Sequence, residues 1–200
     1  RTRAFRMSQM IDELLSSTVS LHADHGTEQV PSEDVVQAAI EQVRPLLEQK
    51  GIRLTVAPKL PRVLGNHARL REVFYNLLSN AIKFSDKTNA RIDIACTVND
   101  GECIFTVADN GTGIPPEELA RVFVPFRRLP AHRNIPGSGL GLYFAKAIVE
   151  QHGGKIWVES SGHDMQNGTG STFYVLLPIT PPQEAKRVLP FESKNASAAQ

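Results

Sequence analysis

The chain has 200 residues, of which 41% are hydrophobic and 22% charged, and its formal net charge is +1. This size can bury one substantial core plus an appendage or tail, so one globular domain is expected. The near-zero charge gives no broad attraction to nucleic acid or to an anionic membrane. No apolar run approaches the roughly 18 residues of a membrane span and no signal segment stands at the start, so we expect a soluble, cytoplasmic piece without membrane contact. The first residue is Arg1 and not Met, which suggests a fragment of a longer protein.

The two cysteines, Cys96 and Cys103, lie seven residues apart within one probable hairpin. Residues so placed are expected to face opposite sides of the sheet rather than to meet. The sequence therefore predicts free thiols, which fit a reducing compartment.

The first 30 residues are expected to hold a helix and a linker. Apolar residues between positions 4 and 21 recur at alternating spacings of three and four, the rhythm of a helix that pairs with another helix. A lone amphipathic helix is the simpler alternative, because the pattern covers less than three heptads. Residues 26–31 are predicted to be a linker, which places a domain boundary near residue 30.

The main domain is expected to span residues 31–178 and to begin with a helix. Ser32 can cap this helix, which runs towards Gly51, and Pro45 should kink or divide it. A strand is predicted over residues 52–57 and a loop over residues 58–65.

The next helix, over residues 66–84, has a continuous apolar face and Asn66 as its expected N-cap. Its apolar residues recur at helical spacing: Leu70, Val73, Phe74, Leu77, Leu78, Ala81 and Ile82. Along a second edge of this helix lie Glu72, Asn76, Asn80 and Lys83. A solvated polar face is the simplest interpretation of that edge, although asparagine is a poor choice for a helix interior.

The second half of the chain alternates strands and helices. Two strands, over residues 91–98 and 102–108, flank the turn sequence Asn99-Asp100-Gly101 and predict a hairpin. A short helix is expected over residues 115–123, an irregular basic lid that is mobile over 124–136, and a helix that ends at Gly153. Strands over 155–160 and 171–177 follow, and residues 179–200 are predicted to be a disordered tail.

Two glycine-rich loops border these elements. Asp109, at a strand end, can accept a hydrogen bond from an exocyclic amine such as that of adenine, while Gly111 and Gly113 leave room for a flat base. An ordinary Asp-Asn-Gly turn is the alternative. The sequence Gly137-x-Gly139-x-Gly141 opens a helix, where free N–H groups favour phosphate oxygens, although a hinge loop would have the same composition. Its spacing is not that of a dinucleotide fingerprint.

Taken together, these motifs resemble the ATP-binding domain of sensor histidine kinases, a branch of the GHKL ATPases, over residues 31–178. Residues 71–83 are similar to the N box of that family, 107–113 to its G1 box, 123–126 to its F box, 137–142 to its G2 box and 168–171 to its last glycine box. Residues 10–18 are similar to the end of the dimerisation hairpin. The sequence around residues 126–139 is most similar to that of phytochrome-like and other soluble, PAS-linked members.

The resemblance implies an α+β fold, a two-layer α/β sandwich of the GHKL (Bergerat) type with a mixed sheet backed by three helices. It implies ATP and Mg²⁺ as cofactors, with Asn80 as the metal ligand and Asn76 and Lys83 positioning the phosphates. Asp109 would hold the adenine amine, with Gly111 and Gly113 beside the base, and Arg128 would close over the phosphates, a role that Arg127 could also take. The rest of the implied nucleotide site comes from the glycine boxes: Gly137, Gly139, Leu140, Gly141 and Ser171.

The resemblance also implies the reaction and the partners. Position 76 holds Asn where relatives that hydrolyse ATP by themselves carry a catalytic Glu, so the acceptor should be a protein histidine. None of the six histidines in this chain lies in the acceptor motif of the family, a helical His followed by Asp or Glu. The chain alone is therefore expected not to phosphorylate itself.

Its expected partners are the phosphoacceptor hairpin of the parent kinase, a response regulator receiver domain and a second copy in a homodimer. Two alternatives remain: a degenerate nucleotide-binding interaction module, and a GHKL serine kinase or ATPase.

Overall fold

A mixed β-sheet forms one layer of the molecule and three helices form the other. The computed structural model describes residues 28–85, 87–128, 137–162 and 170–179. The sheet has five strands in the order β2-β4-β5-β7-β6, in which β2 is parallel to β4 and the other pairs are antiparallel. The elements, in chain order, are β1 (Glu28–Pro31), α2 (Ser32–Lys50), β2 (Arg53–Val56), β3 (Arg62–Gly65), α3 (His67–Lys83), β4 (Arg91–Asn99), β5 (Glu102–Asp109), α4 (Pro116–Leu119), α5 (Gly141–Gln151), β6 (Lys155–Glu159) and β7 (Ser171–Pro178).

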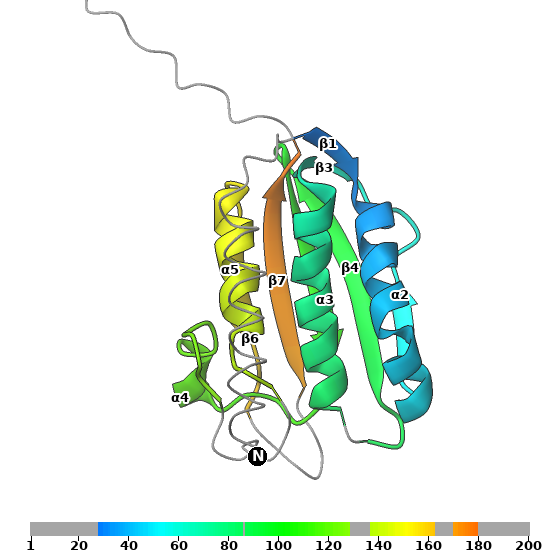
Figure 1. The fold of residues 1–200 in the computed structure, drawn as a ribbon, viewed down its shortest axis with the longest axis vertical. Helices are drawn as coiled ribbons and strands as arrows, with labels where there is room; N and C mark the ends of the chain where they lie inside the picture. The colour runs from blue at the N-terminus through cyan, green and yellow to red at the C-terminus, as the bar shows by residue number, and fades with distance from the viewer. Residues whose placement is uncertain (1–27, 86, 129–136, 163–169, 180–200) are drawn as a thin grey trace, which may run out of the picture.

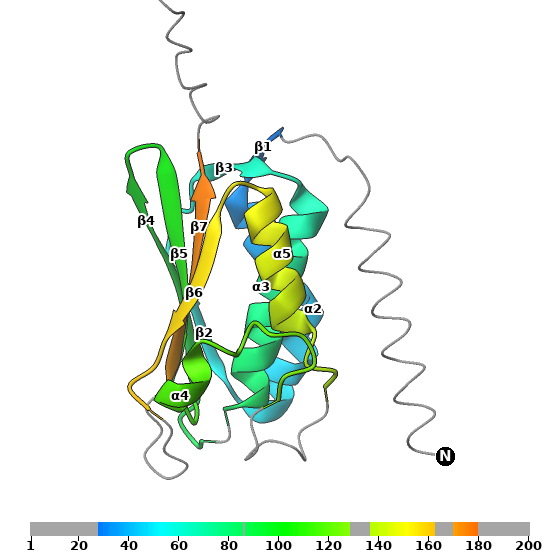
Figure 2. The ribbon, with the colours of Figure 1, turned by 90° about the vertical axis from the view of Figure 1, so that its left-hand side faces the viewer.

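Helices α2, α3 and α5 all cover the same face of the sheet, as Figure 2 shows. The predicted fold class, a two-layer α/β sandwich with a mixed sheet backed by three helices, is therefore confirmed. Helices α2 and α3 run in the same direction, and α5 runs against them (Figure 1). Among the helices of the described residues, none is long and apolar enough to cross a membrane.

The core lies between the two layers. Every apolar residue predicted for the inner face of α3 is buried, and Phe74 packs edge-on against Phe105 of β5 with ring centroids 5.4 Å apart. The outer face of the sheet carries alternate residues of the same strands. There, Trp157 of β6 stacks on Tyr174 of β7 with centroids 4.9 Å apart and an interplanar angle of 1°, and Lys155 Nζ lies 5.8 Å from the Trp157 ring.

The predicted hairpin is present. Its turn shows why the prediction that Cys96 and Cys103 face opposite sides of the sheet was wrong. Asp100 and Gly101 both have positive φ angles, of 44° and 83°, as a two-residue hairpin turn requires. This turn pairs Val98 with Cys103, so Cys96, two residues from Val98, faces the same side of the sheet as Cys103. The expectation of opposite faces was wrong, whereas both thiols are free as predicted.

Four further expectations for residues 26–65 are corrected. The N-cap of α2 is Pro31, and the Ser32 hydroxyl donates to the Pro61 carbonyl instead of capping the helix. Pro45 does not divide α2, because it lies on the exposed side, where water can satisfy the carbonyl that loses its partner. Part of the expected linker forms β1 and part of the expected loop forms β3, and these two strands pair with Val30 opposite Val63.

Some expectations concern segments outside the described residues. These are the N-terminal helix, most of the predicted lid, two residues of the last glycine box and the tail from residue 180. The short helix expected over residues 115–123 is present as α4, but it ends at Leu119 and continues as turns.

Candidate nucleotide-binding site

The polar edge of α3 is the first part of the candidate site. The Asn66 side chain caps this helix by accepting from the Arg69 N–H at 3.1 Å, as predicted. Asn76, Asn80 and Lys83 follow in its C-terminal half and are all half-buried. The helix therefore holds the three predicted side chains on one partly covered edge.

The glycine loop at the start of α5 lies directly against this edge. A Cβ added at Gly141 would lie 2.6 Å from Asn76 Oδ1, and one added at Gly137 would lie 3.8 Å from Lys83 Nζ. The structure thus brings together two motifs that lie far apart in the sequence, residues 71–83 and 137–142. The N–H groups of the first turn of α5 begin beside the Asn76 amide, which is a suitable position for an anion.

Leu140 is the N-cap residue of α5 and is 1% exposed. Its side chain packs inside the protein, so any contribution of Leu140 to a ligand comes from its backbone. Gly139, just before it, has a φ angle of +80°, and a Cβ there would lie 2.8 Å from the Arg127 carbonyl oxygen. The Phe126 N–H donates to the Gly139 carbonyl at 3.0 Å, so this glycine holds the glycine loop against residues 126 and 127.

Arg128 is the predicted phosphate-binding cation, and Arg127 is the alternative. The Arg127 guanidinium forms a two-pronged ion pair with Glu118, with Nη2 at 2.6 Å from Oε1 and Nε at 3.1 Å from Oε2. The hydrogen bonds of this pair lower the pKa of Glu118 and raise that of Arg127. Arg127 is therefore already neutralised by a carboxylate, which sequence reasoning missed because nine residues and several turns separate the two.

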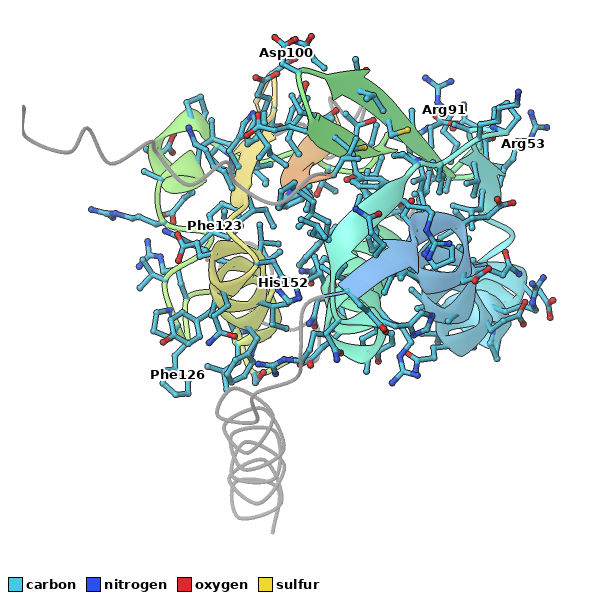
Figure 3. The ribbon with its side chains drawn as sticks, turned by 90° about the horizontal axis from the view of Figure 1, so that it is seen from above. Arg53, Arg91, Asp100, Phe123, Phe126 and His152 are labelled. Carbon is cyan, nitrogen blue, oxygen red and sulfur yellow. The ribbon has the colours of Figure 1, made fainter. Side chains whose placement is uncertain are left out.

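Figure 3 shows the Phe126 side chain at the margin of the molecule, on the helix side. Phe126 has a φ angle of +62°, which is unusual for a residue with a side chain, and it is 56% exposed. Phe123, the other aromatic residue of the predicted F box, packs edge-on against Phe173 with centroids 6.4 Å apart. One aromatic residue of this box thus anchors the segment to the sheet, and the other faces outwards.

Asp109 ends β5 and is the partly buried carboxyl group of the site. Its Oδ1 accepts from the Gly111 N–H at 2.8 Å, and the backbone N–H of Ser171 on β7 also stabilises the charge. Burial nevertheless dominates and raises the pKa of Asp109 to about 6. Such a carboxylate is suited to accept a hydrogen bond from a neutral amine, which restores part of the lost hydration.

The two glycines after Asp109 differ in their surroundings. A Cβ at Gly111 would lie 2.5 Å from the Phe84 carbonyl oxygen, so the space beside Gly111 is filled by the end of α3. The Thr112 N–H donates to the same carbonyl at 3.2 Å. Gly113 has a φ angle of +76°, which favours glycine whatever lies beside it. Gly111 thus joins the loop to α3, a role that the sequence did not indicate.

Ser171 is 7% exposed and faces Asp109 across the β5–β7 pair. Gly170 before it has a φ angle of +71°, and a Cβ there would lie 2.1 Å from the Asp109 carbonyl oxygen. These two residues therefore support the position of Asp109 from the neighbouring strand.

His152 joins α5 to α3 at the end of this helix pair that is opposite the glycine loop. Its Nε2 accepts from the Asn66 N–H at 3.0 Å, and its Nδ1 lies 2.7 Å from the Ile148 carbonyl, so the ring is neutral with both nitrogens engaged. Burial lowers its pKa. In Figure 3 the His152 ring points from α5 towards α3. These contacts give His152 a structural role between the two helices.

The residues present fit a magnesium–nucleotide complex. The absence of a Cβ at Gly141 leaves the Asn76 amide oxygen open to the start of α5, and Asn80 offers the kind of oxygen ligand that Mg²⁺ accepts together with phosphates and water. In the described part of the chain, no group of three or more His, Cys, Asp or Glu side chains could hold a metal alone. A metal at this site would therefore be held jointly by the protein and the phosphates.

Comparison with known proteins identifies the family. The model of histidine kinase-, DNA gyrase B- and HSP90-like ATPases matches residues 65–181, which is more than half of the chain. The chain belongs to this family. Membership confirms the resemblance of the motifs to GHKL ATPases and identifies ATP as the ligand of the family site.

Relatives with similar sequences include phytochromes and a phytochrome-like protein. The chain is 37% identical over 147 residues to the phytochrome-like protein Cph1 of Synechocystis, covering 74% of this chain and 19% of that protein. It is 36% identical over 174 residues to cyanobacterial phytochrome B of Nostoc, covering 86% of this chain and 22% of that protein. The chain thus spans about a fifth of the length of these relatives.

Among solved structures, the mycobacterial sensor histidine kinase MprB matches with a TM-score of 0.65 and 30% identity, covering 78% of this chain and all of that one. A structure of the histidine kinase ThkA in complex with the response regulator TrrA matches with a TM-score of 0.68 at 23% identity, covering 90% of this chain and 49% of that one. The second likeness concerns the fold alone.

Proposed function

We propose that this chain is the ATP-binding catalytic part of a sensor histidine kinase. In the parent protein it would transfer the γ-phosphoryl group of ATP to a histidine of a phosphoacceptor helical hairpin, from which a response regulator aspartate would receive it. The contact between Asn76 and Gly141 carries the proposal, because it sets the polar edge of α3 against the glycine loop that would cradle the phosphates.

The residues have separate tasks in this proposal. Asp109 accepts a hydrogen bond from the adenine amine and fixes the base. Lys83 neutralises phosphate charge beside Gly137, and Arg128 adds a second cation. Asn80 would hold Mg²⁺, which supplies further neutralisation of the phosphate oxygens, and Asn76 positions the phosphates next to it.

The identity of residue 76 favours transfer to a protein over hydrolysis. An amide at this position cannot take a proton from water as a carboxylate does. Of the described histidines, His152 has both ring nitrogens engaged in the protein and cannot attack a phosphoryl group from that position. His67, the other described histidine, begins α3 at the end opposite Asn80 and Lys83, so neither histidine is placed to accept the phosphoryl group. A hairpin of the parent protein would supply the acceptor with the in-line geometry. We place the reaction in the cytoplasm and the parent kinase in a homodimer.

Labelled ATP tests this proposal. Incubation of the chain with γ-labelled ATP and Mg²⁺ should give no acid-labile phosphoprotein, and addition of the parent hairpin should give label on its histidine. A hairpin in which that histidine is replaced by glutamine is the matched control and should stay unlabelled. Strong acid-labile labelling of the chain alone, or rapid release of inorganic phosphate without a hairpin, would contradict the proposal.

A further inference from the structure

The C-terminal ends of α2 and α3 lie side by side at the end of the molecule that carries the candidate site (Figure 1). The two helices are parallel, so the last carbonyl groups of both, and the negative ends of both helix dipoles, meet there. A triphosphate is itself strongly negative. This end of α3 is therefore a poor environment for ATP unless cations offset the carbonyl groups.

Lys50, the last residue of α2, lies at this junction. Its Nζ donates to the Ile82 carbonyl at 2.9 Å and to the Ser85 carbonyl at 3.3 Å, one residue before and two residues after Lys83. The ammonium group also belongs to the last turn of its own helix. The Lys50 ammonium thus interacts with the negative ends of both α2 and α3, which point in the same direction.

The last turn of α3 is held from its other side as well. The Phe84 carbonyl accepts from the Thr112 N–H at 3.2 Å, and Gly111 packs against the same carbonyl. Lys50 and the loop after Asp109 therefore fix three carbonyl groups in the four residues 82–85. Lys83, which lies beside Gly137, is within this fixed segment.

We propose that Lys50 is a positioning residue for the triphosphate of ATP. Its ammonium holds the last turn of α3 so that Lys83 faces the glycine loop, and it offsets the negative carbonyl ends that would repel phosphate. Lys50 acts through α3 and does not contact ATP. The inference rests on the proposed function, because it places the phosphates at this end of α3.

Calorimetry with three ligands tests the inference: adenosine alone, and ADP or ATP with Mg²⁺. Lys50→Met should weaken ATP binding by about threefold to tenfold, a modest loss because Lys50 is exposed, while adenosine affinity should stay within about twofold. Lys50→Arg should restore most of the ATP affinity, because it keeps the charge. If Lys50→Met does not fold, Lys50→Gln removes the charge and keeps an amide donor for one carbonyl.

Lys59→Met is the matched control. Lys59 is an exposed lysine in the segment after β2, beyond the far end of that strand, and its loss should leave all three affinities unchanged. Unchanged ATP affinity in Lys50→Met, or an equal loss for adenosine and ATP, would overturn the positioning role. If the unsubstituted chain bound adenosine but gained nothing from the phosphates, the proposed function itself would fail, and this inference would fail with it.

Discussion

Asp109 is partly buried, and its pKa of about 6 has a direct consequence for ligand binding. Because the raised pKa belongs to an acid, the folded protein holds this proton more tightly than the unfolded chain does, so ionisation of Asp109 costs stability as the pH rises from about 4 to 6. A ligand amine that donates to the carboxylate favours the ionised form. Ligand binding and deprotonation of Asp109 are therefore linked.

We expect adenosine affinity to fall by about tenfold between pH 7 and pH 5, since one protonation with a pKa near 6 occurs in this range. Adenosine is the suitable ligand for calorimetry because it lacks phosphates that would titrate in the same window. Asp109→Asn should bind adenosine weakly and without this pH dependence, because its amide can present a donor to the adenine amine. Wild-type affinity in this variant would remove Asp109 from the base site.

At the scale of elements, the start of α5 depends on Gly139. An alanine there has two costs, the positive φ angle of +80° and the contact of its Cβ with the Arg127 carbonyl at 2.8 Å. Gly153 has a similar φ angle of +72° but nothing within 4 Å of an added Cβ. Substitution of Gly153 therefore introduces backbone strain alone. Substitution of Gly139 introduces similar strain and also displaces residues 126 and 127.

Gly153→Ala should lower the free energy of unfolding by about 1–2 kcal/mol and leave ATP affinity unchanged. Gly139→Ala should lower the free energy of unfolding at least as much and also weaken Mg²⁺–ATP binding by about tenfold, because the glycine loop moves away from the Asn76 edge. Thermal unfolding and calorimetry of both variants provide the comparison. Equal ATP affinities would show that the position of this loop does not matter for the phosphates.

The elements also show what the sequence could and could not predict. The polar edge of α3 and its Asn66 cap follow from spacing within one helix, so local periodicity was sufficient. The ion pair between Arg127 and Glu118 depends on the path of irregular turns, which no period describes. The contact of Gly141 with Asn76 depends on how α5 packs against α3, so the family resemblance implied a shared site without giving its contacts.

At the scale of the whole molecule, β1 (Glu28–Pro31) lies across the domain boundary that the sequence predicts near residue 30. The sequence placed it near residue 30 because residues 26–31 have the composition of a linker. The structure instead pairs β1 with β3, buries Val30 to 3% exposure and bonds the Gln29 side chain to the Ile179 carbonyl. A strand of four residues whose partner begins more than 30 residues later leaves almost no signal in sequence.

Two shortened chains test this boundary. A chain that begins at Glu28 keeps β1, whereas one that begins at Ser32 loses it and exposes Val63. The second should be less stable by about 2–3 kcal/mol, roughly the burial of one valine and part of another, and should unfold about 5–10 °C lower. Differential scanning calorimetry measures both. Equal melting temperatures would place the boundary after β1, close to the sequence-based prediction.

The stack of Trp157 on Tyr174 places an intrinsic fluorophore on the outer face of the sheet. Trp157 is the only tryptophan of the chain, and it follows the buried Ile156 on β6, so it lies on the sheet face opposite the helices. Its fluorescence therefore reports on the β6–β7 edge, and ATP at the end of α3 should change it little. A neighbouring domain or partner that covers this face would shift the emission, so one intrinsic fluorophore can detect assembly without interference from nucleotide.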